Sequence, residues 1–147
     1  MTERQAKILI VDDEFHNREL LIVLLKLEGH LTMTANSGEA ALEIVARNPP
    51  DLILLDVMMP VMDGYRVAAK LKSDPATRHI PIIMVTALDD RRSKLHGLDA
   101  GAEDFLTKPI DRAELWVRVR NLLRLKKYND LLANNNLLLQ QQAQEGS

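Results

Sequence analysis

The chain of 147 residues contains no cysteine, which excludes disulfide bonds, thiolate catalysis and metal sites with cysteine ligands. Aromatic residues are scarce too, with one tryptophan, two tyrosines and two phenylalanines. A core must therefore be built from aliphatic side chains, which favours packed layers of sheet and helix. No apolar run approaches the roughly 20 residues of a membrane span, and the first residues lack the pattern of a secretory signal. We expect a cytoplasmic protein that does not bind membranes.

An excess of charge of one sign is also missing. The 19 lysine and arginine residues nearly balance the 21 aspartate and glutamate residues, and the formal net charge is −2. A chain with this balance has no long-range attraction for nucleic acid. A basic run lies between residues 118 and 127, but no aromatic residues interleave it. We expect this run to be a solvated helix face or a surface for salt bridges with a protein, and we expect no nucleic-acid partner.

What the sequence does have is an alternation of short apolar runs with longer amphipathic stretches, which predicts repeated β-α-β units. The predicted strands are Lys7–Val11, His30–Ala35, Leu52–Leu55, Ile82–Val85 and Phe105–Leu106. The predicted helices lie near Glu14–Glu28, Glu39–Arg47, Tyr65–Lys72, Arg91–Asp99 and from Asp111 onward. Strands joined by helices are parallel, and right-handed crossovers then predict a doubly wound α/β fold, with helices on both faces of a five-stranded parallel sheet.

The C-terminal segment differs in composition from the rest of the chain. Asn129–Ser147 contains eight Asn or Gln, five leucines and two charged residues, so we expect one domain over residues 1–126 and a helical extension or linker over 127–147. Two sets of residues recur every seven positions here, one suited to heptad position d (Leu125, Leu132, Leu139) and one to position a (Leu122, Asn129, Asn136). This pattern predicts a short two-stranded coiled coil or, because it is so short and rich in asparagine, a frayed linker.

Polar side chains follow four of the five predicted strands. Asp12 and Asp13 follow the first strand, Asp56 follows the third and Thr86 the fourth, and Lys108 comes shortly after the fifth. Aspartate often ends a strand or caps a helix without any function. However, the carboxyl ends of parallel strands meet at one edge of the sheet, where ligands bind in open α/β folds. We therefore expect these five residues to form one site.

Three carboxylates in one cleft repel one another, so either one of them has a raised pKa or a cation is bound between them. Oxygen ligands without histidine or cysteine select a hard ion, and Mg²⁺ suits an open rim with few carboxylates. Mg²⁺ and a lysine beside a carboxylate nucleophile form an arrangement suited to phosphoryl transfer. The product would be an aspartyl phosphate.

Four segments, KILIVDDE, DLILLDVMMPVMDG, MVTAL and DFLTKP, resemble the receiver domain of two-component response regulators, over roughly residues 6–125. The resemblance implies a flavodoxin-like fold with strand order 2-1-3-4-5. It also implies that Asp56 is the phosphoacceptor. The implied Mg²⁺ ligands are Asp12, Asp13, Asp56 and the backbone carbonyl of Met58, with Asp13 as the direct ligand of the acidic pair.

The same resemblance implies a switch at the far side of the site. Thr86 and Lys108 are the residues expected to contact the phosphoryl group, and Phe105 is the expected aromatic switch. The Lys108–Pro109 bond is expected to be cis, which is chemically plausible because proline follows. We expect phosphorylation to change the face made by the fourth helix, the fifth strand and the fifth helix, and a homodimer to form through it. The implied phosphodonor is a sensor histidine kinase or a histidine phosphotransfer protein.

Two alternatives stay open. The stretch DFLTKPIDRAEL followed by RVRNLLRLKKY resembles receivers that precede diguanylate cyclase or HD-GYP phosphodiesterase domains, so the chain is alternatively the receiver part of a longer regulator with a cyclic-di-GMP output. A magnesium-dependent phosphatase with an aspartyl nucleophile, of the haloacid-dehalogenase type, is the alternative of another class. It requires a second aspartate two residues after the nucleophile, where this chain has Met58. We therefore expect a regulatory phosphoacceptor and not an enzyme.

Overall fold

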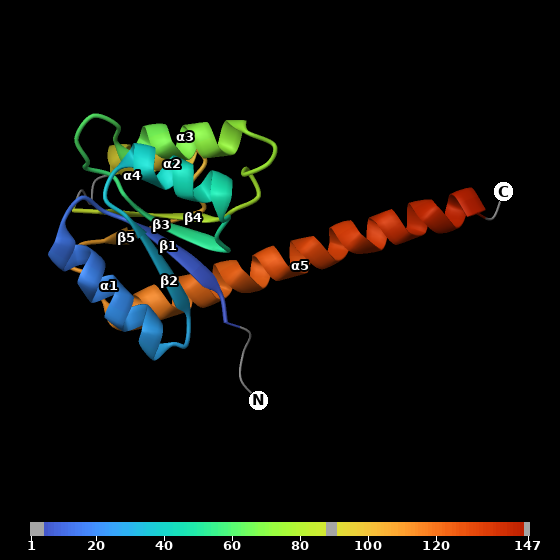
Figure 1. Ribbon diagram of the computed structural model, residues 1–147, viewed down its shortest axis with the longest axis horizontal. Helices are drawn as coiled ribbons and strands as arrows, with labels where there is room; N and C mark the ends of the chain where they lie inside the picture. The colour runs from blue at the N-terminus through green and yellow to red at the C-terminus, as the bar shows by residue number, and fades with distance from the viewer. Residues whose placement is uncertain (1–4, 88–90, 146–147) are drawn as a thin grey trace.

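The computed structural model describes residues 5–87 and 91–145, with side chains up to residue 135 (Figure 1). Five parallel strands form one sheet in the order β2-β1-β3-β4-β5, which confirms the predicted order. The strands are β1 Lys7–Val11, β2 Leu31–Ala35, β3 Leu52–Asp56, β4 Ile82–Thr86 and β5 Asp104–Thr107. The helices are α1 Phe15–Leu27, α2 Gly38–Arg47, α3 Gly64–Ser73, α4 Arg91–Asp99 and α5 Arg112–Glu145. The predicted doubly wound α/β fold is therefore confirmed.

Local signals in the sequence account for several element ends. Gly29 follows α1 with φ at 84°, a conformation that costs glycine little because it has no Cβ. Ser37 begins α2, and its hydroxyl accepts a hydrogen bond from the backbone N–H of Ala40 at 3.1 Å. β3 and β4 each run one residue further than predicted. Asp56 and Thr86 are thus the last residues of their strands and are fixed by the sheet itself.

The sheet is covered on both faces, and each face has its own core. Figure 1 shows α2, α3 and α4 on one side of the sheet and α1 with the first part of α5 on the other. Successive strand residues point to opposite faces. Leu9 and Leu55 accordingly lie in the core beneath α2 and α3, whereas Ile10 and Leu54 lie in the core beneath α1 and α5. Both cores are almost entirely aliphatic, as the shortage of aromatic residues predicts.

Helix α5 belongs only in part to the domain. Leu115 and Val119 are buried against the sheet, and the Trp116 indole N–H donates to the carbonyl of Leu24 in α1 at 3.0 Å. The helix then continues without a break past residues 126 and 127 and runs out beyond the α/β body (Figure 1). The long C-terminal helix is therefore confirmed. Within the described part of the chain, no helix has the length and apolar character that crossing a membrane requires.

The residues of the predicted heptad pattern differ in their surroundings. Leu122 packs partly against the core of its own domain, whereas Leu125 and Leu132 are 52% and 44% exposed. Tyr128, at 61% exposed, joins these two leucines on the face of α5 that points away from the domain. The side chains of Asn136 and Leu139 lie outside the described residues. The coiled coil itself stays a prediction.

Candidate functional site

The five polar residues predicted to form one site do meet at one edge of the sheet. Asp12 and Asp13 follow β1, Asp56 ends β3, Thr86 ends β4 and Lys108 follows β5. These four strands are consecutive neighbours in the sheet and all run in the same direction, so their carboxyl ends bring the side chains together. Asp12, Asp56 and Thr86 are buried at 1%, 4% and 1% exposure. Burial of polar residues at the end of an aliphatic sheet marks this edge as the candidate site.

Three carboxylates form the centre of the site. One oxygen each from Asp12, Asp13 and Asp56 lies within 4.8 Å of the others. Two of the three side chains are buried and Asp13 is exposed, so the cluster opens to solvent on one side. All of these donors are oxygens, which fits a hard divalent cation that keeps part of its water shell, as Mg²⁺ does. The donor set therefore fits the ion that the sequence predicts.

A lysine contacts two of these carboxylates. The Nζ atom of Lys108 lies 3.2 Å from Asp56 Oδ1 and 3.4 Å from Asp12 Oδ2. The peptide bond between Lys108 and Pro109 is cis, as the resemblance implies. The Lys108 backbone N–H also donates to the carbonyl of Thr86 at 2.7 Å. This hydrogen bond fixes the Lys108 backbone to the end of β4, and from there the side chain reaches the carboxylates.

The electrostatics of the cluster show an unbalanced negative charge. Burial, together with repulsion from Asp12, raises the pKa of Asp56 from 3.8 to about 6, although Lys108 and a hydrogen bond from the Met58 backbone N–H oppose the rise. Burial alone would lower the pKa of Lys108, but attraction to Asp56 and Asp12 outweighs it, and the pKa is raised. One lysine does not compensate for the carboxylates, so a cation at this position would be stabilised.

Arg18 braces the loop that carries the acidic pair, and the sequence analysis did not identify it. Its guanidinium donates from Nη1 to the backbone carbonyl of Asp12 at 2.8 Å, one turn into α1. The Asp12 carboxylate in turn accepts a hydrogen bond from the Glu14 backbone N–H at 2.9 Å. Both the main chain and the side chain of Asp12 are thus held. Nothing in a single sequence distinguishes this arginine from an exposed helix residue.

Gly64 allows α3 to begin directly beside the phosphoacceptor candidate. Its backbone N–H donates to the carbonyl of Val57 at 2.9 Å. A Cβ at this position would collide with the backbone carbonyl of Asp56 and would lie 2.9 Å from the Cα of Val57. The structure thus shows a close approach of two backbones that only glycine permits. Asp63 supplies the cap of α3 by accepting from the Arg66 backbone N–H.

The predicted switch residues lie on neighbouring strands. Phe105 stands opposite Met84 in β4, two residues before Thr86. The aromatic ring of Phe105 packs on Gly97 of α4 so closely that a Cβ on that glycine would lie 2.5 Å from the ring Cζ. Phe105 is partly buried against the core beneath α2 and α3. The structure thus places the Phe105 ring beside both β4 and α4, so a movement of either element would change the packing of the ring.

A second contact attaches α4 to its neighbour. The ring of Tyr65 in α3 stacks on His96 with 3.9 Å between centroids and 15° between planes. The Tyr65 hydroxyl donates to the carbonyl of Ser93 at 3.2 Å. Gly97 is the residue that α4 buries. The position of α4 therefore depends on a small number of contacts, two of which involve aromatic rings.

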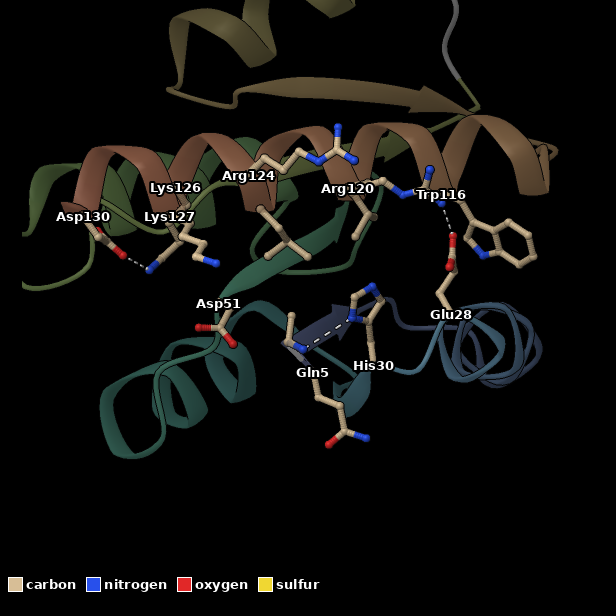
Figure 2. A pocket seen from close by; sticks show the side chains of 13 residues that line it. Gln5, Glu28, His30, Asp51, Trp116, Arg120, Arg124, Lys126, Lys127 and Asp130 are labelled. Carbon is tan, nitrogen blue, oxygen red and sulfur yellow. Dashed lines mark hydrogen bonds and ion pairs between the residues drawn. The ribbon is translucent and has the colours of Figure 1, made fainter. Parts of the chain in front are cut away.

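A groove of about 780 Å³ lies at the opposite edge of the sheet, far from the carboxylates (Figure 2). It separates α5 from the first residues of the strands. In Figure 2, Arg120 of α5 pairs with Glu28 at the end of α1, at 2.9 Å. Charges of both signs line the groove, and Trp116 lies at one end of it. None of the predicted site residues lines this groove, so the groove is not part of the candidate site.

The family model described as "Response regulator receiver domain" matches residues 8–120. Response regulator PleD of Caulobacter vibrioides is 54% identical over 127 residues, which is 86% of this chain and 28% of PleD. The ycf27 protein of Guillardia theta is 42% identical and is matched over 47% of its length. The chain therefore spans about a quarter to a half of the length of these curated relatives.

Solved structures show the same likeness. A crystal structure from Chloroflexus aurantiacus, named as a response regulator, matches with a TM-score of 0.80 and 39% identity, over 82% of this chain and 99% of that chain. The chemotaxis protein CheY4 of Vibrio cholerae matches with a TM-score of 0.77 and 29% identity, over 81% of this chain and 99% of that chain. Each of these two matches covers about four fifths of this chain and nearly all of the other chain.

Proposed function

Because the chain belongs to the family of response regulator receiver domains, a class of two-component signalling proteins, we propose that it accepts a phosphoryl group on Asp56 and changes conformation in response. The observation that carries the proposal is the cluster itself. Three carboxylate oxygens lie within 4.8 Å of one another, and the ammonium of Lys108 lies 3.2 Å from the Asp56 oxygen. Burial and repulsion from Asp12 raise the pKa of Asp56, which stands at the end of a central strand.

Each residue has a role that its position supports. Asp12, Asp13, Asp56 and the Met58 carbonyl would hold Mg²⁺, which would offset the negative charges that meet during phosphoryl transfer. An oxygen of the Asp56 carboxylate attacks phosphorus and forms the new P–O bond, while the bond from phosphorus to the donor atom breaks and its electron pair leaves with the donor. The ammonium of Lys108 then pairs with a phosphoryl oxygen.

The switch follows from the change in charge at Asp56. A carboxylate of one negative charge becomes a phosphoryl group with nearly two, and it gains oxygens that accept hydrogen bonds. The Thr86 hydroxyl is drawn toward these oxygens, and its movement vacates space that the Phe105 ring can fill. The face formed by α4, β5 and α5 changes as a result, and the equilibrium between two packings shifts.

The partners follow from the same proposal. A sensor histidine kinase or a histidine phosphotransfer protein supplies the phosphoryl group, and a second copy of the chain binds through the face of α4, β5 and α5. Exposed Leu95 and Leu98 on α4 and Val117 on α5 support this use of the face. A location in the cytoplasm stays a prediction, and so does the division into a domain over 1–126 and an extension over 127–147.

A phosphate-affinity gel tests the proposal directly. The chain is incubated with acetyl phosphate, with Mg²⁺ or with EDTA, beside the variants Asp56→Asn and Asp63→Asn. We expect a shifted band only with Mg²⁺, its loss in Asp56→Asn, and its retention in Asp63→Asn, which keeps a side chain that can cap α3. An undiminished shift in Asp56→Asn would disprove the assignment of Asp56.

Two further possibilities are weighed by specific observations. The chain covers 28% of PleD, and α5 continues beyond the domain, so a longer regulator with a cyclic-di-GMP output agrees with both facts and stays an alternative. An aspartyl phosphatase of the haloacid-dehalogenase type requires a general acid two residues after Asp56. The side chain there is that of Met58, an exposed thioether that cannot transfer a proton. We therefore propose a regulatory role without turnover of a separate substrate.

A further inference from the structure

The loop between β3 and α3 contains an unusual residue. Val61 has a φ of 70°, and the Met62 backbone N–H donates to the carbonyl of Pro60 at 2.8 Å across it. These features define a γ-turn with a positive central φ, which is rare and strained. For a β-branched residue this conformation is a steric outlier, whereas glycine or asparagine would adopt it more readily. The backbone of this loop is therefore strained at Val61, and glycine or asparagine at this position would reduce the strain.

The strain at Val61 is not offset by burial. Its side chain is 87% exposed, the highest value among the large apolar side chains that are exposed in the described residues. The loop is fixed on both sides of it, because Met59 is buried in the core and Met62 packs beside Gly38 at the start of α2. Val61 is consequently held out into solvent by a rigid loop. At 87% exposure it gains little packing against the residues that the structure describes, and nothing there accounts for a valine.

The position of the side chain points to a function. Val61 stands five residues after Asp56, in the loop at the edge of the sheet where the carboxylates meet. Met58, in the same loop, is 62% exposed. Asp56 itself is 4% exposed, so any protein that delivers a phosphoryl group to it must bring its own surface down onto this edge. Two apolar side chains beside a buried nucleophile would be covered by that surface.

We propose that Val61 is a specificity-determining contact for the protein phosphodonor, packing against apolar side chains that surround the donor's phosphohistidine. The inference rests on the proposed phosphorylation of Asp56. A permanent occupant such as a second copy would close the route to Asp56, so the surface suits a partner that binds and leaves. A small phosphodonor has no surface to place on Val61 and reaches Asp56 without it. The two kinds of donor should therefore respond differently to a change at this residue.

The test compares two donors on the full chain. Acetyl phosphate is the small donor, and a panel of purified histidine kinases, autophosphorylated with ATP, supplies the protein donors. The variants are Val61→Asn and Val61→Gly, which both tolerate a positive φ and both remove the apolar side chain. Leu31→Asn is the control, because it removes an exposed apolar side chain at the start of β2, at the end of the sheet opposite the carboxylates. Melting temperatures of both Val61 variants are expected at or above that of the wild type, so lost transfer would not reflect unfolding.

We expect transfer from the kinase that labels the wild type fastest to slow by about tenfold or more in both Val61 variants, the size of effect typical of a central interface contact. Labelling by acetyl phosphate should stay within about twofold, and Leu31→Asn should match the wild type with both donors. Equal slowing with both donors would overturn the inference, as would unchanged transfer from the kinase. Failure of every kinase to label a wild type that acetyl phosphate labels would also overturn it. If acetyl phosphate does not label the wild type at all, the proposed function itself is wrong.

Discussion

At the scale of single residues, Asp56 is the group whose environment most opposes its charge. Ending a central strand places it among aliphatic side chains, and Asp12 lies beside it. Lys108 and the Met58 backbone N–H recover only part of what burial costs the carboxylate. Without a bound ion, the folded protein therefore holds a negative charge on Asp56 that a cation or a proton would stabilise. Function at such a site is obtained at the expense of stability.

The unfavourable environment of the Asp56 carboxylate predicts how the free energy of unfolding depends on pH. The pKa of Asp56 is about 6 in the folded protein and near 3.8 in the unfolded chain, so the folded state binds this proton more tightly. The contribution of Asp56 to stability must then rise as pH falls from about 6.5 to 4, and it is unfavourable above that range. In EDTA, we expect Asp56→Asn to be more stable than the wild type at pH 7.5 by on the order of 2 kcal/mol.

Urea unfolding at several pH values measures this difference. The advantage of Asp56→Asn should shrink toward pH 4, because the wild-type carboxyl is then protonated in the folded state. Asp63→Asn is the control, since Asp63 caps a helix at the surface and lies outside the cluster of Asp12, Asp13 and Asp56. An advantage of Asp56→Asn that is constant from pH 4 to 7.5 would contradict the raised pKa.

At the scale of elements, α4 has the weakest attachment to its sheet. It buries Gly97 alone among its nine residues, and Leu95 and Leu98 face solvent. Its described anchors include the Phe105 ring on Gly97, the stack of Tyr65 on His96 and the hydrogen bond from the Tyr65 hydroxyl to the carbonyl of Ser93. A helix held in this way can move at low cost in lost burial, which suits an element expected to respond to the phosphoryl group.

The variant Gly97→Ala tests whether Phe105 holds α4 in place. Alanine is favoured over glycine in a helix by about 1 kcal/mol, but its Cβ would lie 2.5 Å from the Phe105 ring Cζ. We therefore expect Gly97→Ala to destabilise the wild type by about 1 kcal/mol and to stabilise a Phe105→Ala background by a similar amount. Thermal or urea unfolding of the four proteins gives the coupling. The same effect in both backgrounds would show that the ring and the helix are not coupled.

The elements show where sequence reasoning succeeds and where it ends. Apolar periodicity located every strand and helix, because the two-sided burial of a parallel sheet leaves runs such as Leu52–Leu55 with no polar residue. The sequence predicted that Asp12, Asp13, Asp56 and Lys108 lie together, because strand order brings strand ends together. Arg18 and Gly97 were not found, since their partners, a backbone carbonyl and a ring on another element, leave no local signature. The pattern of a single sequence does not show which distant segments contact one another.

At the scale of the whole molecule, the chain is a compact body with a helix that leaves it. Leu125, Tyr128 and Leu132 line the outward face of that helix, and no described residue of the chain covers them. The predicted seam paired the leucines with Leu122, but Leu122 is partly covered by the domain. Tyr128 is the better placed companion. A second copy of the chain could bury all three side chains in a parallel dimer.

Sedimentation measures whether this face associates. We expect a beryllofluoride mimic of the phosphoryl group to tighten dimerisation by about tenfold, because the switch alters the face of α4, β5 and α5 in both copies. The double variant Leu125→Ala, Leu132→Ala should lose dimerisation with and without the mimic. Leu27→Ala, which removes an exposed leucine from α1, should behave as the wild type. Identical monomer–dimer constants in all samples would show that the helix is only a linker.

The uninterrupted path of α5 gives the molecule a mechanical property. The helix has 34 residues, and its last 22 extend past Leu123, a residue that packs partly against the core of the domain. At about 1.5 Å per residue, this arm is roughly 33 Å long. A tilt of about 5° at its base would move the tip by about 3 Å, so a rotation too small to disturb the packing of Leu115 and Val119 becomes a displacement as large as a hydrogen bond. The displacement of the tip for a given tilt increases with the number of helical turns beyond the domain, so the helix amplifies small rotations at its base.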